Sequence, residues 1–487
     1  MKTKLLLLTA FLIPAVLNAG YSAGRSYYTK KNYDKAKEEF LAAVEQNPKD
    51  GNSYFFLGEI EKNLGNFKEA EEYYRLAIEG NTDKRFKNFA YWNYNLMVEQ
   101  RGEPKDIVIA YKTFYKNMNN HESVKKIDTL IDKLLWTDNQ NAQNFYKEGV
   151  SLKESGKKNE AIESFKKAAA QDSAFLAPHY QIGMILFDLN DKNGAARELS
   201  IVAEKLPFYY GANRILADIY FSQNSFVSAE KYYSNCIIYG ITTSDTEYTL
   251  FLKRATCRYN VKNYDEALED AVKASNLRKS ETDPLFIMSV IYISNSDYDK
   301  AVSTLKSIDK LLPNSPQVLF QIGTIYYKQN KTEYIAYFDK LFNAVSTSNE
   351  IPDKFYKAFV ISANYHFSQK SYSQFTRIIS AIPEKMMDGQ MKLNAGKAYF
   401  ETLNFKKTIH FLESVSLSNE NKLLLALAYL KDNQRDKCKQ TLSEIKNDTA
   451  IKSMALDNKN LRPIMQEIIN EDKLINEPVK SPDTVSQ

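Results

Sequence analysis

Cysteine, histidine, glycine and proline are all scarce in this sequence. Its 487 residues include three Cys, four His, 16 Gly and 13 Pro. An all-β protein needs a turn every ~8–12 residues, and turns depend on Gly and Pro, so an all-β architecture is disfavoured. The few His and Cys residues also provide few ligands for a metal centre built from these residue types. Long helices joined by short corners are the organisation that this composition favours.

An excess of charge of one sign is also missing. Lys and Arg number 65 against 60 Asp and Glu, which gives a formal net charge of +5. A chain with this charge balance has no large excess of basic residues of the kind that binds nucleic acid. Apolar residues make up 44% and charged residues 26%, which excludes wholesale disorder, collagen and a polytopic membrane protein.

The common catalytic motifs are absent. The chain has no phosphate-binding Gly-x4-Gly-Lys-Ser/Thr, no nucleophile-bearing Gly-x-Ser-x-Gly and no metal-binding His-Glu-x-x-His. Its histidines are far apart in sequence, at His121, His179, His366 and His410. We therefore expect no catalytic residues, no metal and no cofactor, and a non-enzymatic protein.

Residues 1–19 have the composition of a secretory signal peptide. Two lysines precede an apolar run from Leu5 to Leu17, and small residues follow at Ala19 and Gly20. A retained membrane anchor is the alternative, but the run is shorter than the ~20 residues that span a bilayer. No Cys follows the run, which disfavours a lipid anchor. We expect cleavage after Ala19 and an exported protein, periplasmic or secreted.

The strongest signal in the chain is an internal repeat with a 34-residue step. A small residue is followed 12 positions later by Ala, 16 positions later in most units by a bulky or aromatic residue, and 19 positions later by an apolar, mostly small residue. The pattern occurs at Gly24/Ala36/Phe40/Ala43, Gly58/Ala70/Tyr74/Ala77, Gly149/Ala161/Phe165/Ala168, Gly183/Ala195/Leu199/Val202, Ala217/Ala229/Tyr233/Cys236, Ala255/Ala267/Ala271/Ala274 and Ser289/Ala301/Leu305/Ile308. Within a unit, apolar residues recur at helical spacing and are interrupted midway by a turn, which predicts two antiparallel helices per unit.

This pattern resembles the tetratricopeptide repeat family, in which the eighth position is small, the twentieth is Ala, the twenty-fourth is aromatic and the thirty-second is Pro. Pro48, Pro207 and Pro313 hold that last position. The resemblance implies an all-α, right-handed superhelical solenoid of antiparallel helix pairs, with about 11–12 units.

The regularity of the repeat predicts the domain organisation. We expect a signal peptide (1–19), N-terminal repeats (20–84), a degenerate unit with an extra helix (85–138), a central array (139–348), divergent repeats (349–446), a capping helix (447–470) and a disordered tail (471–487).

The resemblance also implies a concave groove that is lined by the fifth, ninth and twelfth positions of each unit. Several of these positions hold large side chains that can anchor a partner. The candidate binding residues are Tyr146, Tyr180, Phe187, Arg214, Phe221, Tyr259, Phe286, Phe320 and Tyr327. The alternative is that these aromatic residues only pack the repeat.

Cys236 and Cys257 lie on helices that are expected to be neighbours, whereas Cys438 is remote. In an oxidising compartment the first two could form a disulfide, or both could be small core residues.

The function that these expectations favour is an exported scaffold that holds one or more envelope proteins or peptides in its groove, in an envelope, secretion or flagellar-motor assembly. Nucleic acid and small-molecule cofactors are not expected partners, and any contact with the membrane would be indirect. A peptidoglycan- or glycan-binding module is the alternative, because aromatic side chains also stack on sugar rings. A clamp for the acidic C terminus of cytosolic chaperones is disfavoured, because Arg214 is the only residue that matches the positions such a clamp uses.

Overall fold

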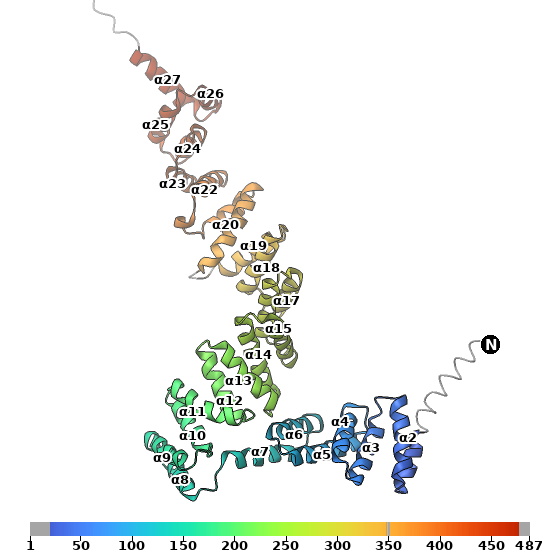
Figure 1. The fold of residues 1–487 in the computed structure, drawn as a ribbon. Coiled ribbons are helices and arrows are strands. Elements are labelled where there is room, and N and C mark those ends of the chain that lie inside the picture. The colour runs from blue at the N-terminus through green and yellow to red at the C-terminus, as the bar shows by residue number, and fades with distance from the viewer. Residues whose placement is uncertain (1–19, 347, 349–350, 477–487) are drawn as a thin grey trace, which may run out of the picture. The chain divides into compact units, whose positions relative to one another are not determined.

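The computed structural model describes residues 20–346, 348 and 351–476, so the expected leader (1–19) and the residues from 477 onward lie outside the described part. Every regular element in the described part is a helix, and the all-α fold is confirmed (Figure 1). None of these helices is both long and apolar enough to cross a membrane. The chain forms two compact units, unit 1 up to Lys279 and unit 2 from Ser280.

Unit 1 starts with a helix that covers residues 20–29 of the described chain. The helices that follow are α2 (Tyr33–Gln46), α3 (Gly51–Leu64), α4 (Phe67–Glu79), α5 (Lys84–Arg101), α6 (Pro104–Met118), α7 (Glu122–Leu135), α8 (Gln140–Glu154), α9 (Lys158–Gln171), α10 (Ala177–Asp188), α11 (Lys192–Lys205), α12 (Tyr210–Ser222), α13 (Phe226–Tyr239), α14 (Ser244–Asn260) and α15 (Tyr264–Leu277).

Unit 2 continues with the same alternation of helices and short turns. Its elements are α16 (Asp283–Ser294), α17 (Tyr298–Leu311), α18 (Pro316–Lys328), α19 (Tyr334–Val345), α20 (Asp353–Ser368), α21 (Tyr372–Ile379), the 3₁₀ helix η1 (Glu384–Met386), α22 (Gly389–Glu401), α23 (Phe405–Glu413), α24 (Asn419–Lys431), α25 (Arg435–Ile445), α26 (Thr449–Asp457) and α27 (Arg462–Asn476).

The two helices of a repeat pack closely because a glycine on the first helix faces a bulky side chain on the second. A Cβ atom at Gly58 would lie 2.8 Å from the ring of Tyr74, and one at Gly149 would lie 2.7 Å from the ring of Phe165. The same contact joins Gly183 to Leu199 at 2.5 Å. Small residues at the eighth position are therefore a steric requirement of the helix pair.

The turn inside each repeat contains one residue in the left-handed backbone conformation. This residue recurs at the same place in each unit, at Lys31, Gly65, Gly156, Asn190, Asn224, Lys262, Ser296 and Asn330, with φ between 53° and 83°. From Gly156 onward its spacing equals the period of the sequence repeat at every step except the one from Asn224 to Lys262, which is longer. The backbone thus repeats with the period that the sequence predicts, and the longer step reflects the longer first helix α14, which has 17 residues against 13 in α12.

The later repeats of unit 2 have shorter second helices. The left-handed residues there are Lys370, Leu403 and Asn433, which follow one another at steps shorter than the period of the earlier repeats. The corresponding second helices, α21, α23 and α25, have 8, 9 and 11 residues, against 14 in α17. A shorter second helix moves every later position out of the frame of the earlier repeats, which explains why the sequence pattern fades in this part of the chain.

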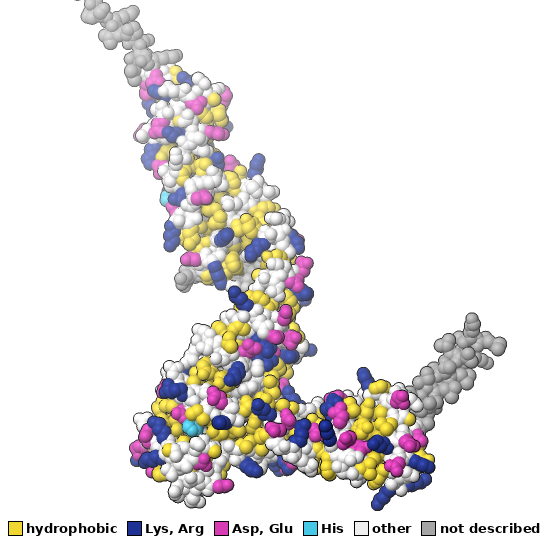
Figure 2. Space-filling view, in the orientation of Figure 1, with side chains coloured by type: hydrophobic (Ala, Val, Ile, Leu, Met, Phe, Trp, Pro, Cys, Tyr) yellow, Lys and Arg dark blue, Asp and Glu magenta, His cyan; other side chains and the backbone are white. Residues whose placement is uncertain are grey.

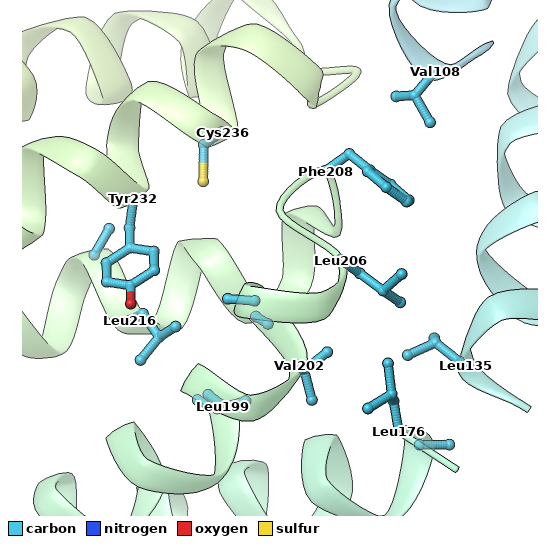
Figure 3. Packing of buried hydrophobic residues seen from close by; sticks show 14 of the residues in the cluster. Val108, Leu135, Leu176, Leu199, Val202, Leu206, Phe208, Leu216, Tyr232 and Cys236 are labelled. Atoms are coloured by element: carbon cyan, nitrogen blue, oxygen red, sulfur yellow. The ribbon is translucent and has the colours of Figure 1, made fainter. Parts of the chain in front are cut away.

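Residues 84–135 form three helices, α5 to α7, which is the expected pair with one extra helix. Trp92 occupies the eighth position of this unit and is 38% exposed, so the close glycine contact of the other repeats is missing. α6 also packs against α13, far away in sequence. Val108 of α6 and Leu135 of α7 belong to the same apolar cluster as Leu206 and Phe208 (Figure 3).

The C-terminal end differs from the sequence expectation in two ways. A single capping helix over 447–470 was expected, but α26 and α27 are separate helices, and Leu461 lies between them. Pro463 stands in the first turn of α27, where its missing N–H is tolerated. The buried side chains of Leu461, Ile464 and Met465 cover the last apolar face of unit 2. Residues 471–476, which were expected to be disordered, continue α27.

Candidate partner-binding surface

The nine predicted binding residues all lie on the first helices of successive repeats. These first helices are α8, α10, α12 and α14 in unit 1, and α16 and α18 in unit 2. The nine side chains are partly or well exposed, and Phe187 and Tyr327 are the most exposed, at 36% and 43%. Both units present hydrophobic side chains at the surface, interleaved with charged ones (Figure 2). We call the six residues in unit 1, Tyr146, Tyr180, Phe187, Arg214, Phe221 and Tyr259, the leading-helix face.

At one end of this face, aromatic rings and polar groups lie together. Tyr146 contacts Trp136 and Phe175, with ring centroids 5.2 and 5.3 Å away. Gln181 donates a hydrogen bond of 3.3 Å to the Tyr146 hydroxyl and accepts one of 2.8 Å from Lys153 Nζ. Burial raises the pKa of Tyr146 above its usual value, although the bond from Gln181 opposes this effect. The phenol therefore stays neutral and can hydrogen-bond a ligand.

Tyr180 lies one repeat further along and meets Tyr209 edge to face, with centroids 5.0 Å apart. Tyr209 is held neutral, because burial raises its pKa strongly and its hydrogen bond with Tyr180 adds to the effect. The Tyr180 ring is positioned by this contact and remains partly exposed.

Arg214 forms an ion pair with Asp218 one helical turn later. Asp218 also accepts hydrogen bonds from Tyr233 OH at 2.7 Å and from Lys253 Nζ at 2.9 Å. Burial alone would raise the pKa of Asp218, but its bonds to Lys253, Tyr233 and Arg214 hold it below the usual value. One carboxylate thus serves two cations.

Phe221 lies beside this cluster. Lys253 Nζ is 5.3 Å from the centroid of the Phe221 ring, a distance at which a cation and an aromatic face attract. Phe221 also meets the rings of Phe226 and Tyr233 edge to face. Tyr259, in the next repeat, contacts Tyr264 with centroids 5.8 Å apart.

The three predicted residues of unit 2 take part in packing to different degrees. Phe320 contacts Phe355 of the following repeat, with centroids 5.4 Å apart. Phe286 packs at the edge of an apolar cluster formed by α16 to α18. Tyr327 contacts Tyr334 edge to face at 5.2 Å and is the most accessible of the three.

Sequence reasoning missed three exposed apolar residues on α5. Phe89, Trp92 and Leu96 are 47%, 38% and 36% exposed and follow one another at helical spacing. Phe89 and Leu96 occupy the fifth and twelfth positions of their unit, one repeat period after Phe55 and Lys62. Continuing the repeat count through the degenerate segment would have found them.

Cys236 and Cys257 are both free, buried thiols in the structure, which favours the second of the two alternatives for them. They have different surroundings: Arg214 and Lys112 are among the charged groups near Cys236, whereas Glu230 and Lys253 are near Cys257. Burial raises the pKa of each thiol to about 12. They are core residues, as the alternative interpretation had it.

No set of three or more His, Cys, Asp and Glu side chains in the described part of the chain is arranged to hold a metal ion. Three of the histidines pair with single carboxylates in separate repeats: His179 with Glu198, His366 with Asp339 and His410 with Glu384.

Comparison with known proteins identifies the repeats. Models of the tetratricopeptide repeat match residues 21–84, 138–175, 180–235 and 317–348, so the presence of these repeats is confirmed. The remaining residues are not covered by these matches.

Two curated relatives and one solved structure illustrate the similarity. The TPR repeat-containing protein MJ1428 of Methanocaldococcus jannaschii is 22% identical over 71% of this chain. The photosystem I assembly protein Ycf3 of Prochlorococcus marinus is 30% identical over 19% of it. The chain spans 64% and 54% of the lengths of these relatives. YrrB, described as a TPR protein with an unusual peptide-binding site, is 18% identical over 38% of this chain and 95% of its own, with a TM-score of 0.32.

Proposed function

We propose that this chain of tetratricopeptide repeats is a non-enzymatic scaffold that holds a protein or peptide segment on the leading-helix face. The observation that carries the proposal is a difference in burial between two sets of aromatic residues. Phe40, Tyr74, Phe165 and Tyr233, which pack the helix pairs, are completely buried. The aromatic residues of the leading-helix face are partly exposed in successive repeats, as interface anchors are before a partner covers them.

The charges on this face favour a partner segment that carries carboxylates between apolar side chains. Lys153, Arg214 and Lys253 supply three cations, and Asp218 is the carboxylate that pairs with two of them. Rim charges chiefly set association rate and salt dependence, so binding should weaken as ionic strength rises.

We further propose that the protein is exported and serves the assembly of a complex in the cell envelope, with proteins or peptides of the envelope as partners. The composition of residues 1–19 supports export. The name of the relative Ycf3, an assembly protein, supports an assembly role. Cell fractionation together with the intact mass of the protein tests the location. Recovery in the cytoplasm with residues 1–19 retained would remove the envelope role and leave the binding role standing.

Photo-crosslinking from the leading-helix face tests the binding role. A photoreactive phenylalanine analogue replaces Phe187, and in a matched control it replaces Phe67, which is 51% exposed and lies at the start of a second helix. Position 187 is expected to capture one or a few defined proteins in the living cell, and position 67 is not. Recovery of glycan strands from position 187 would support the glycan-binding alternative instead.

A triple substitution, Phe187→Ala, Phe221→Ala and Tyr259→Ala, complements the crosslinking. Truncating buried anchors of an interface typically weakens binding by ~2 kcal/mol or more each. The captured partner should therefore be lost, while circular dichroism shows that the helices persist. A triple variant that keeps every partner would contradict the proposed face.

A further inference from the structure

In a regular solenoid each repeat contacts only its neighbours. The α6–α7 segment departs from that rule, because it contacts three successive junctions between repeats. At the first junction, between α9 and α10, Leu176 N donates to Leu135 O at 3.1 Å. Trp136, the C-cap residue of α7, meets the ring of Phe175 edge to face, with centroids 5.2 Å apart. The C-terminal end of α7 is thus tied to the first junction.

The second junction lies between α11 and α12 and is held by apolar contact. Leu206 and Phe208 of this junction are 6% and 4% exposed. They share one cluster with Val108 and Leu135, and Figure 3 shows these side chains directed toward one another across the gap between the two parts of the chain.

The third junction follows α13 and is held by two lysines of α6. The side chain of Lys112 is buried, and its Nζ donates to the carbonyl oxygens of Ile237 at 2.5 Å and Ile238 at 2.9 Å. These carbonyls belong to the last turn of α13, where helix geometry leaves oxygens free and the helix dipole favours a cation. Lys116 Nζ pairs with Glu247 of α14 at 2.5 Å.

We propose that α6 and α7 form a brace that fixes the curvature of the three repeats from α8 to α13. The brace is fastened at the first junction by a backbone bond and a ring contact, at the second by apolar packing and at the third by Lys112 and Lys116. α6 contacts α13, the last helix of the three repeats, so the three repeats are held at both ends. Bending them would require one of these fastenings to break.

The brace has a consequence for the leading-helix face. Tyr146, Tyr180 and Arg214 sit on the three braced repeats, so their spacing is set before any partner arrives. A preorganised surface loses less conformational entropy on binding than a flexible one. The brace itself does not depend on the proposed function, and it can be tested with no partner present.

Distance measurement between spin labels tests the brace. Labels are attached at Lys147→Cys on α8 and Lys231→Cys on α13, both exposed positions, in a protein whose three native thiols are buried. The otherwise unchanged protein should give one narrow distance distribution. Lys112→Glu places a carboxylate against the carbonyls of α13, and Lys116→Glu places one against Glu247. Each variant should broaden the distribution and add a second component.

Two controls make the outcome specific. Lys125→Glu is the matched charge reversal on α7, where Lys125 is 76% exposed and pairs within its own helix with Glu122. It should leave the distribution narrow. Combining Lys116→Glu with Glu247→Lys restores the ion pair with reversed polarity and should restore the narrow distribution. If Lys112→Glu reduces the helix content, the Lys116 variants decide the test. Unchanged distributions in the folded variants would show that α6 and α7 do not constrain the repeats.

Discussion

Gly58 and Tyr74 approach so closely that no Cβ atom fits between them, since a Cβ at position 58 would lie 2.8 Å from two carbons of the tyrosine ring. The ring cannot move aside easily, because it is fully buried and its hydroxyl donates to Glu59 at 2.5 Å. The pair illustrates how each repeat joins its two helices.

Gly58→Ala is therefore expected to destabilise the protein. Ala normally favours a helix over Gly by ~1 kcal/mol, but overpacking a filled site costs ~1–3 kcal/mol, and here the second effect should dominate. Gly389→Ala is the matched control, since its Cβ meets nothing within 4 Å. Chemical denaturation should show a loss for position 58 and little change for position 389. A gain in stability at position 58 would show that the helix pair relaxes freely.

Asp270 of α15 holds two arginines of the preceding helix, α14. It is fully buried and accepts bonds of 2.7 and 2.8 Å from Arg254 and one of 2.8 Å from Arg258. Asp270→Ala leaves both guanidinium groups without this partner, and breaking a buried pair in this way costs ~3–5 kcal/mol. Asp299→Ala, at a side chain that is 92% exposed, should change stability by less than ~0.5 kcal/mol. Equal losses in the two denaturation curves would contradict the assignment.

Lys112 should make stability depend on pH in the mildly alkaline range. Burial is the main cause that lowers its pKa, to about 8, while nearby Lys116 lowers it further and Glu247 and Cys236 oppose the effect. Above pH 8 the folded protein has released this proton, whereas the unfolded chain still binds it. The contribution of Lys112 to the free energy of unfolding therefore increases as pH rises from about 8 toward the ordinary pKa of lysine.

The measurement is the stability of the natural protein minus that of Lys112→Met, followed from pH 7.5 to pH 9 by urea denaturation. This difference in the free energy of unfolding should change so that the natural protein gains stability relative to Lys112→Met as pH rises. The same comparison with Lys125→Met, at an exposed position, should be flat. A flat difference for Lys112 as well would show that its amine is solvated.

The native cysteines should resist alkylation. Burial raises the pKa of Cys236 and Cys257 to about 12 and that of Cys438 to about 11, so almost no thiolate exists at pH 8. Iodoacetamide at pH 8 should modify none of the three in the folded protein and all three in urea without reductant. Two fewer modified thiols in urea would reveal a disulfide.

Much of the fold could be predicted from the sequence, because in a repeat protein most contacts are local. The contact of Gly183 with Leu199 joins the two helices of one repeat and recurs at a fixed step, so periodicity alone finds it. The contact of Lys112 with Ile237 spans 125 residues and occurs once, and no periodic signal could show it. Trp92 breaks the pattern at the eighth position, which hid the exposed residues of α5.

The binding surface could be predicted less well. The positions of Tyr146 and Phe187 on first helices followed from the repeat frame, but their exposure depends on what packs beside them. Asp218 was readable as a partner of Arg214, since residues four apart on a helix are neighbours. The second cation, Lys253, comes from the next repeat and became apparent only in three dimensions.

Substitutions at the left-handed residue in each turn can change the thermal stability of this protein without altering its core or its binding surface. Asn and Gly adopt that conformation readily, whereas other L-residues pay about 1–2 kcal/mol. Lys262 and Ser296 hold it in consecutive repeats, with φ of 64° and 60°. The backbone is therefore strained at these two turns in the middle of the chain. Lys262→Gly and Ser296→Gly should relieve the strain and raise the melting temperature of the protein. A rise in melting temperature from either substitution would identify the repeat that contains it as one that limits the thermal stability of the chain.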